Sequence, residues 1–236
     1  MWCVIIPTYN NSRTVRRVVA DVLTVAPHVI VVDDGSTDGT AEILSQLDVT
    51  VVSHSRNRGK GAALVTGFRQ ALADGYDYAV TIDSDGQHFA TDIPRLVEAM
   101  REHPGNLIVG CRNLDEDGMP AGNTFANRFS NFWFKVQTGI SLADTQTGLR
   151  MYPLYRLPCL RLLTSRYEAE LALLVMMAWR GVEITQVAVS VSYDPEGGRV
   201  SHFRPVYDFA RISLLNTVLC FFAVVYGLPA KLLRKL

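Results

Sequence analysis

Short apolar runs rich in valine and isoleucine alternate with helix-like segments over the first half of the chain. The apolar runs predict strands at 2–7, 28–33, 49–53, 77–83 and 106–111. The segments between them predict helices at 13–25, 39–47, 60–74 and 91–102. Elements that alternate in this way form right-handed βαβ units. The pattern therefore predicts an α/β fold with a mainly parallel, twisted sheet flanked by helices.

Residues 124–136 have the spacing of an amphipathic helix. One face carries large apolar side chains, namely Phe125, Phe129, Phe132, Trp133 and Val136. The other face carries Arg128 and Lys135. Packing of this helix against the core explains the pattern, and contact with lipid is the alternative.

The last third of the chain predicts a helix from Glu168 to near Gly181, a strand at 182–193 and a hydrophobic C-terminal helix. Residues 212–228 are 17 residues without a charge, slightly short of the roughly 20 that a bilayer span needs. Three cations follow them, namely Lys231, Arg234 and Lys235. This helix can be buried, lie in a membrane interface or span a membrane, and the sequence leaves these alternatives open.

Composition excludes several classes of protein. Hydrophobic residues make up 48% of the 236 residues, which is enough for a core and argues against disorder. Lys plus Arg and Asp plus Glu are balanced at 23 each, so nucleic acid is not an expected partner. The four cysteines lack zinc-ligand spacing. The chain opens directly into a predicted strand, without the pattern of a secretory signal, so we do not expect it to be exported.

Two carboxylates follow the predicted strand 77–83, within Asp83-Ser84-Asp85-Gly86-Gln87-His88. Open α/β sheets bind ligands at the carboxyl ends of their strands. Asp-x-Asp at such an end can hold a hard divalent cation together with diphosphate oxygens. Turn and helix-cap roles are the alternative explanation for such a pair.

Polar segments also follow the first three predicted strands. Pro7-Thr8-Tyr9-Asn10 offers an aromatic ring and Asp33–Gly39 offers carboxylates, which together could hold a nucleobase, although a turn and helix cap would also explain 33–39. Arg56–Gly61 brings three cations to a helix N-terminus, where they could meet phosphates. It lacks the Walker A pattern, and no GxGxxG follows the first strand.

These motifs together resemble the family 2 glycosyltransferases of the GT-A fold, and within them the dolichyl- or polyprenyl-phosphate sugar synthases. The matching segments follow the family's order and extend over about residues 2–205. They are Ile6–Asn10, Val31–Thr40, Arg58–Gly61, Asp83–His88, Gly110–Arg112 and Asp144–Arg150. Each segment alone is a weak signal, but their joint occurrence is specific.

The resemblance implies roles for individual residues. Pro7, Tyr9, Val32 and Asp34 match positions that hold the base and ribose. Asp83, Ser84 and Asp85 match the donor diphosphate motif, and Asp85 and Gln87 match its ligands for Mg²⁺ or Mn²⁺. Arg112 and Arg128 match arginines that hold an acceptor phosphate. We expect Lys60, Arg199 and His202 to contact the donor as well, although the synthases usually have lysine where this chain has His202.

The resemblance also implies the reaction. We expect residues 1–205 to form a GT-A domain that transfers a sugar, with inversion, from a UDP- or GDP-sugar to a polyprenyl phosphate. We expect 206–236 to form a membrane-associating helix that keeps the protein peripheral or monotopic on the cytoplasmic face. Transfer to a hydroxyl of a lipid or glycan is the alternative, with Asp144 or Glu168 as candidate base. A sugar nucleotidyltransferase is a more remote alternative, as is a non-catalytic nucleotide-binding protein.

Overall fold

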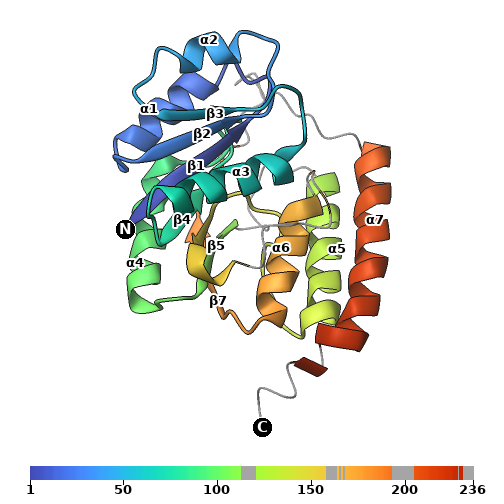
Figure 1. Cartoon of the computed structure of the whole chain (residues 1–236). Helices are drawn as coiled ribbons and strands as arrows, with labels where there is room; N and C mark the ends of the chain where they lie inside the picture. Colours follow the sequence, from blue (N-terminus) through green and yellow to red (C-terminus); the bar gives the residue numbers. More distant parts are fainter. Residues whose placement is uncertain are drawn as a thin grey trace.

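The computed structural model describes residues 1–112, 121–157, 164, 166, 168–192, 205–227 and 229–230. These residues form a seven-stranded sheet with helices on both faces (Figure 1). The strands are β1 Trp2–Thr8, β2 Val29–Asp33, β3 Thr50–Ser53, β4 Tyr78–Thr81, β5 Leu107–Arg112, β6 Arg150–Pro153 and β7 Ile184–Val189. The α-helices are α1 Val15–Leu23, α2 Thr40–Leu44, α3 Lys60–Ala73, α4 Ile93–Glu102, α5 Ala121–Thr138, α6 Glu168–Trp179 and α7 Pro205–Phe222. Short helical turns are η1 Ala90–Asp92, η2 Leu154–Arg156 and the π-helical η3 Ala223–Gly227.

The sheet is mainly parallel, as the sequence predicts. Its strand order is β3-β2-β1-β4-β6-β5-β7. The β3-β2, β2-β1, β1-β4 and β5-β7 pairs are parallel. The carboxyl ends of β1, β2, β3 and β4 therefore meet at one edge of the sheet, and the polar segments that follow these strands are brought together there.

Strand β6 was not predicted, and it runs antiparallel to its neighbours β4 and β5. It begins with a charged residue, Arg150, and ends with Pro153, so it lacks the apolar run that predicts a strand. Arg150 is fully buried. Its guanidinium donates to the carbonyl oxygens of Glu170 at 3.0 Å and Thr145 at 2.9 Å, and these hydrogen bonds offset part of the cost of burying the charge.

Two hydrophobic clusters hold the helices against the two faces of the sheet. Helices α3, α5, α6 and α7 contribute to one cluster, and α1, α2 and α4 to the other (Figure 1). Helix α3 packs closely on β1, because a Cβ atom at Gly67 would lie 2.5 Å from Cγ2 of Ile5. The site at the carboxyl edge is thus supported from both sides.

Helix α7 packs with one side against the domain. Leu215 and Leu219 of α7 and Ala223 of η3 are at most 4% exposed, and they belong to the same cluster as Ile5 of β1. Nowhere in the described part of the chain does a helix combine the length and apolar character required to cross a membrane.

Candidate active site

Hydrogen bonds join the loop after β1 to the loops after β2 and β4. Asn11 Nδ2 donates to Ser84 Oγ at 2.7 Å, and Thr14 Oγ1 donates to the Ser84 carbonyl at 2.6 Å. Asn10 Oδ1 accepts from the backbone of Thr37 at 2.7 Å. The three loops are therefore fixed relative to one another before any ligand binds, which is the preorganisation that a binding site needs.

Asp34 fixes the loop after β3. This carboxylate is 2% exposed, and it accepts from the backbone N–H groups of Arg58 at 2.9 Å and Gly59 at 2.6 Å. It also contacts His54 Nδ1 at 2.6 Å, while His54 Nε2 contacts Thr66 Oγ1 at 2.8 Å. Asp34 thus organises the 54–59 loop, and its contact with a nucleobase stays a prediction.

The other residues predicted to hold the base lie at the same edge. Pro7 and Val32 are register partners in β1 and β2, and both are buried. Tyr9 follows β1 and is half-buried. The structure thus brings these residues together with Asp34, as the motif order predicts.

Lys60 lies between two carboxylates at the N-terminus of α3. Its Nζ is 2.6 Å from Asp83 Oδ1 and 2.7 Å from Glu170 Oε2. Burial alone would lower the pKa of Lys60, but Asp83 and Glu170 raise it above its ordinary value. Burial would likewise raise the pKa of Asp83, whereas the charge of Lys60 holds it below its ordinary value. Both groups therefore stay ionised at neutral pH.

The Asp83 carboxylate also packs against the backbone of Gly148. A Cβ atom at Gly148 would lie 2.3 Å from Asp83 Oδ2, so only glycine leaves room for this carboxylate. Thr81 Oγ1 donates to the Gly148 carbonyl at 2.8 Å and holds the two segments together. The position of Asp83 is thus set by Lys60 on one side and Gly148 on the other.

Asp85 and Gln87 follow Asp83 in the same loop, and both are half-buried. Asp85 Oδ1 accepts from the Gln87 backbone N–H at 3.0 Å, and Gly86 between them has a positive φ of 76°. Within the described residues, no group of three or more His, Cys, Asp or Glu side chains could hold a metal ion. One carboxylate and one amide oxygen fit a hard cation that takes its other ligands from substrate phosphates and water.

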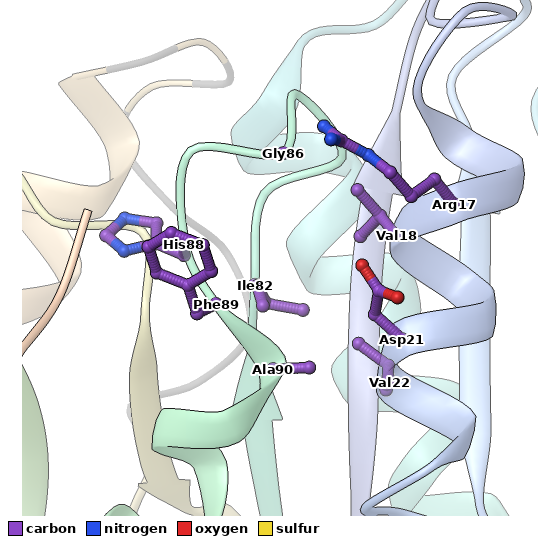
Figure 2. Close-up of a pocket in the computed structure, with 9 residues that line it drawn as sticks. All are labelled: Arg17, Val18, Asp21, Val22, Ile82, Gly86, His88, Phe89 and Ala90. Carbon is purple, nitrogen blue, oxygen red and sulfur yellow. The ribbon is translucent and has the colours of Figure 1, made fainter. Parts of the chain in front are cut away.

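A narrow cleft separates α1 from the loop that carries Asp85. Figure 2 shows it between Val18 and Val22 of α1 on one side and Ile82 and Ala90 on the other. Its free volume is about 50 Å³, far below the roughly 300–1,000 Å³ of ligand pockets. The cleft is therefore too small for a nucleotide.

His88 directs its ring away from α1, to the other side of this loop (Figure 2). It is 7% exposed, and burial lowers its pKa to about 4 although Asp83 partly opposes the shift. The ring is therefore neutral at physiological pH. His88 Nδ1 has no hydrogen-bond partner within the described residues.

Arg112, at the end of β5, forms a bidentate ion pair with Asp144. Its Nε and Nη2 donate to the two carboxylate oxygens at 2.5 and 3.0 Å. Asn127 of α5 also donates to Asp144, at 2.8 Å. Burial would raise the pKa of Asp144, but the hydrogen bonds and charge of Arg112 hold it below its ordinary value. Arg128 is exposed next to Asn127, so α5 brings it to the end of β5.

Sequence reasoning missed several residues that shape the site. His54, Asn11 and Glu170 all reach it through contacts with residues distant in the sequence. Glu170 lies in the first turn of α6, where an acidic side chain favours the helix dipole, and this is the only role that the local sequence suggests for it. Two predicted donor contacts, Arg199 and His202, lie outside the described residues.

The sequence model of "Glycosyl transferase family 2" matches residues 3–152. The UDP-N-acetylglucosamine–dolichyl-phosphate N-acetylglucosaminyltransferase of Methanococcus voltae is 30% identical over 212 residues, covering 80% of this chain and 84% of that protein. The polyprenol monophosphomannose synthase of Mycolicibacterium smegmatis is 31% identical over 160 residues, covering 63% of this chain and 60% of that protein.

Solved structures agree at the level of the fold. Glucosyl-3-phosphoglycerate synthase from Mycobacterium tuberculosis, in complex with Mn²⁺, uridine diphosphate and phosphoglyceric acid, superposes with a TM-score of 0.71. It is 21% identical, and the match covers 94% of this chain and 78% of that one. The resemblance stated above is thus confirmed by the family match and by relatives across most of the chain, and the chain is a glycosyltransferase that belongs to family 2.

Proposed function

We propose that the chain transfers a sugar, with inversion, from a nucleoside-diphosphate sugar to a membrane lipid acceptor, and that this acceptor is a polyprenyl phosphate. Relatives named for dolichyl-phosphate, undecaprenyl-phosphate and polyprenol acceptors support the proposal. The donor is a UDP- or GDP-sugar. Because sugar nucleotides are cytoplasmic, the protein acts on the cytoplasmic face of a membrane.

We choose a phosphate rather than a hydroxyl acceptor because neither candidate general base is free to accept a proton. Transfer to a hydroxyl would require a carboxylate base, and Asp144 and Glu168 are the sequence candidates. Asp144 is fully buried and paired with Arg112, which makes it a weak base. Glu168 is 2% exposed, and its Oε1 lies 2.6 Å from Nη2 of Arg211. A phosphate monoester, by contrast, is largely dianionic at neutral pH and needs no base, because its second pKa is about 6.

The residues of the β4 loop suit the donor half of this reaction. When bound by Asp85, Gln87 and the diphosphate, a Mg²⁺ or Mn²⁺ ion would stabilise negative charge on the departing phosphate. Asp83, held by Lys60 and Gly148, presents a fixed carboxylate that can accept hydrogen bonds from donor hydroxyl groups. Ser84 binds Asn11, which keeps the loop in place. Arg199 and His202 remain predicted donor contacts.

The acceptor half would lie between the end of β5 and α5. Arg112 is oriented by both oxygens of Asp144, and Asn127 links Asp144 to the helix that carries Arg128. Arginine guanidinium groups bind phosphate through paired, charge-assisted hydrogen bonds. They would hold the phosphate in line with the anomeric carbon, which is how positioning lowers the barrier.

The direct test compares a lipid phosphate with the corresponding alcohol. Purified protein in detergent, supplied with Mn²⁺ and a panel of UDP- and GDP-sugars, is expected to glycosylate dolichyl phosphate with at least one donor and to leave dolichol unmodified. Product is measured by thin-layer chromatography and mass spectrometry. Transfer to dolichol would contradict the proposal of a phosphate acceptor. So would transfer to a soluble hydroxyl acceptor without transfer to dolichyl phosphate.

Arg128→Ala is expected to raise the acceptor KM by about tenfold or more, because a charge-assisted contact with phosphate contributes roughly 1.5–3 kcal/mol. Donor affinity should stay near the wild-type value. Steady-state kinetics with varied acceptor and direct binding of the nucleotide separate the two effects. Arg101→Ala, an exposed arginine on α4, is the matched control. An equal loss of donor affinity in Arg128→Ala would assign Arg128 to the nucleotide site instead.

A further inference from the structure

Six large apolar side chains of α5, α7 and η3 are more than half exposed. They are Phe132 of α5, Leu214 and Phe221 of α7, and Val224, Val225 and Tyr226 of η3. Helices α5 and α7 lie side by side at one side of the molecule, with α7 outermost (Figure 1). We propose that this outer surface docks on an anionic lipid bilayer without crossing it. The proposal rests on the proposed function only in that it explains how the protein reaches a lipid acceptor.

The exposed side chains on α7 follow helical spacing. Leu214, Val218 and Phe221 occupy positions i, i+4 and i+7 of α7, which places them in one stripe along the helix, and Val225 continues the exposed apolar surface in η3. Their exposed fractions are 67%, 37%, 65% and 60%. Residues 212–230 contain no charged side chain. An apolar stripe of this length on a protein surface marks an interaction site.

The opposite side of α7 is built into the domain. Leu215 and Leu219 pack in the sheet-facing cluster. Gln137 Nε2 of α5 donates to Asn216 Oδ1 at 2.9 Å, and both of these side chains are buried. Moving α7 into a transmembrane position would expose this apolar side and break a buried hydrogen bond. The helix can therefore meet a bilayer only with its outer stripe, in the plane of the interface.

Exposed Lys135 follows exposed Phe132 by three residues on α5, so these two side chains are neighbours on the helix surface. The sequence continues after residue 230 with Lys231, Arg234 and Lys235. An apolar surface with basic residues beside it suits a leaflet that contains anionic lipids, where each such cation adds about 1 kcal/mol. In a two-fold dimer that used this surface, each patch would face its own copy. Each copy would then bring its own exposed Lys135 to the contact, so the charge favours an anionic leaflet over a second copy.

The docking surface is also connected to the catalytic edge. Arg211 of α7 forms an ion pair with Glu168 of α6, with 2.6 Å between Nη2 and Oε1. Two residues further along α6, Glu170 contacts Lys60, which in turn contacts Asp83. A bilayer that holds α7 would thus hold the donor site at a fixed orientation to the membrane. A lipid phosphate that cannot leave the bilayer could then reach it.

Vesicle binding by purified full-length protein tests the surface without any substrate. The probes are vesicles of phosphatidylcholine with or without phosphatidylglycerol, and bound protein is measured by flotation. The variant Phe221→Glu/Val225→Glu puts two carboxylates on the stripe. Leu72→Glu, at a 41% exposed apolar position on α3, is the matched control.

Wild type and Leu72→Glu are expected to bind the phosphatidylglycerol vesicles, and the double variant to bind at least about tenfold more weakly, since it loses two apolar contacts. The three proteins should have the same melting temperature and the same affinity for nucleotide. Equal binding by the double variant, or no vesicle binding by wild type, would overturn the proposal. The proposal would also be overturned if light scattering without lipid showed that wild type is a dimer and the double variant is a monomer. Transfer to dolichyl phosphate in detergent is independent of this surface, so failure of docking and failure of the proposed function are distinguishable.

Discussion

Asp85→Asn is expected to reduce sugar transfer by at least about a hundredfold, the scale of losing one preorganised electrostatic contact at a reacting group. The substitution keeps the size of the side chain and the oxygen that accepts from the Gln87 backbone, so the loop should keep its conformation. It removes the negative charge that would hold a divalent cation beside the donor diphosphate. Initial rates at several Mn²⁺ concentrations, together with the melting temperature, measure the effect.

Asp21→Asn is the matched control, because this carboxylate is exposed on α1 beside the same loop without belonging to the site. It should transfer sugar at the wild-type rate. The Asp85→Asn rate is expected to recover only partly at high Mn²⁺, since the amide oxygen is a weaker ligand for a hard cation. A wild-type enzyme that is fully active in EDTA, or an Asp85→Asn enzyme that matches it, would refute the metal assignment.

The sequence predicted the parallel part of the sheet and the edge at which the motifs meet. Strands β1, β2, β4 and β5 are buried apolar runs, and this pattern identifies a strand from local sequence alone. Successive parallel strands must present their carboxyl ends to the same edge. The loops that carry Tyr9, Asp34 and Asp83 therefore had to be neighbours once the strands were recognised.

Long-range pairings could not be predicted in this way. Lys60 was expected to meet phosphate, because a lysine at a helix N-terminus suggests an anion site. Its carboxylate partner Glu170 lies 110 residues further along the chain. Likewise, Asp144 was a candidate base, and nothing local shows that Arg112 and Asn127 would bind its oxygens. The local sequence pattern predicts that a charged residue lies at the carboxyl edge of the sheet. Which charged side chain it pairs with depends on the tertiary fold.

Lys60→Met is expected to lower the free energy of unfolding by about 3–5 kcal/mol, the cost of leaving one member of a buried ion pair uncompensated. Without Lys60, the carboxylates of Asp83 and Glu170 would face each other, at 27% and 9% exposure. Glu170 Oε1 already lacks a hydrogen-bond partner within the described residues, so the loss of Lys60 would leave both oxygens of this carboxylate without a described donor. The loss is a large fraction of the roughly 5–15 kcal/mol that stabilises a typical domain. Urea unfolding at neutral pH measures it.

A double variant distinguishes the loss of the ion pair from a simple loss of packing. Lys60→Met/Glu170→Met removes both members and leaves Asp83 with partial access to water, so it should be more stable than Lys60→Met alone. Lys135→Met, at an exposed lysine on α5, should change stability by about 0.5 kcal/mol or less. If Lys60→Met costs no more than this control, the ion pair does not hold α3 and α6 together. Asp83 would then owe its position to Gly148 and the β4 loop alone.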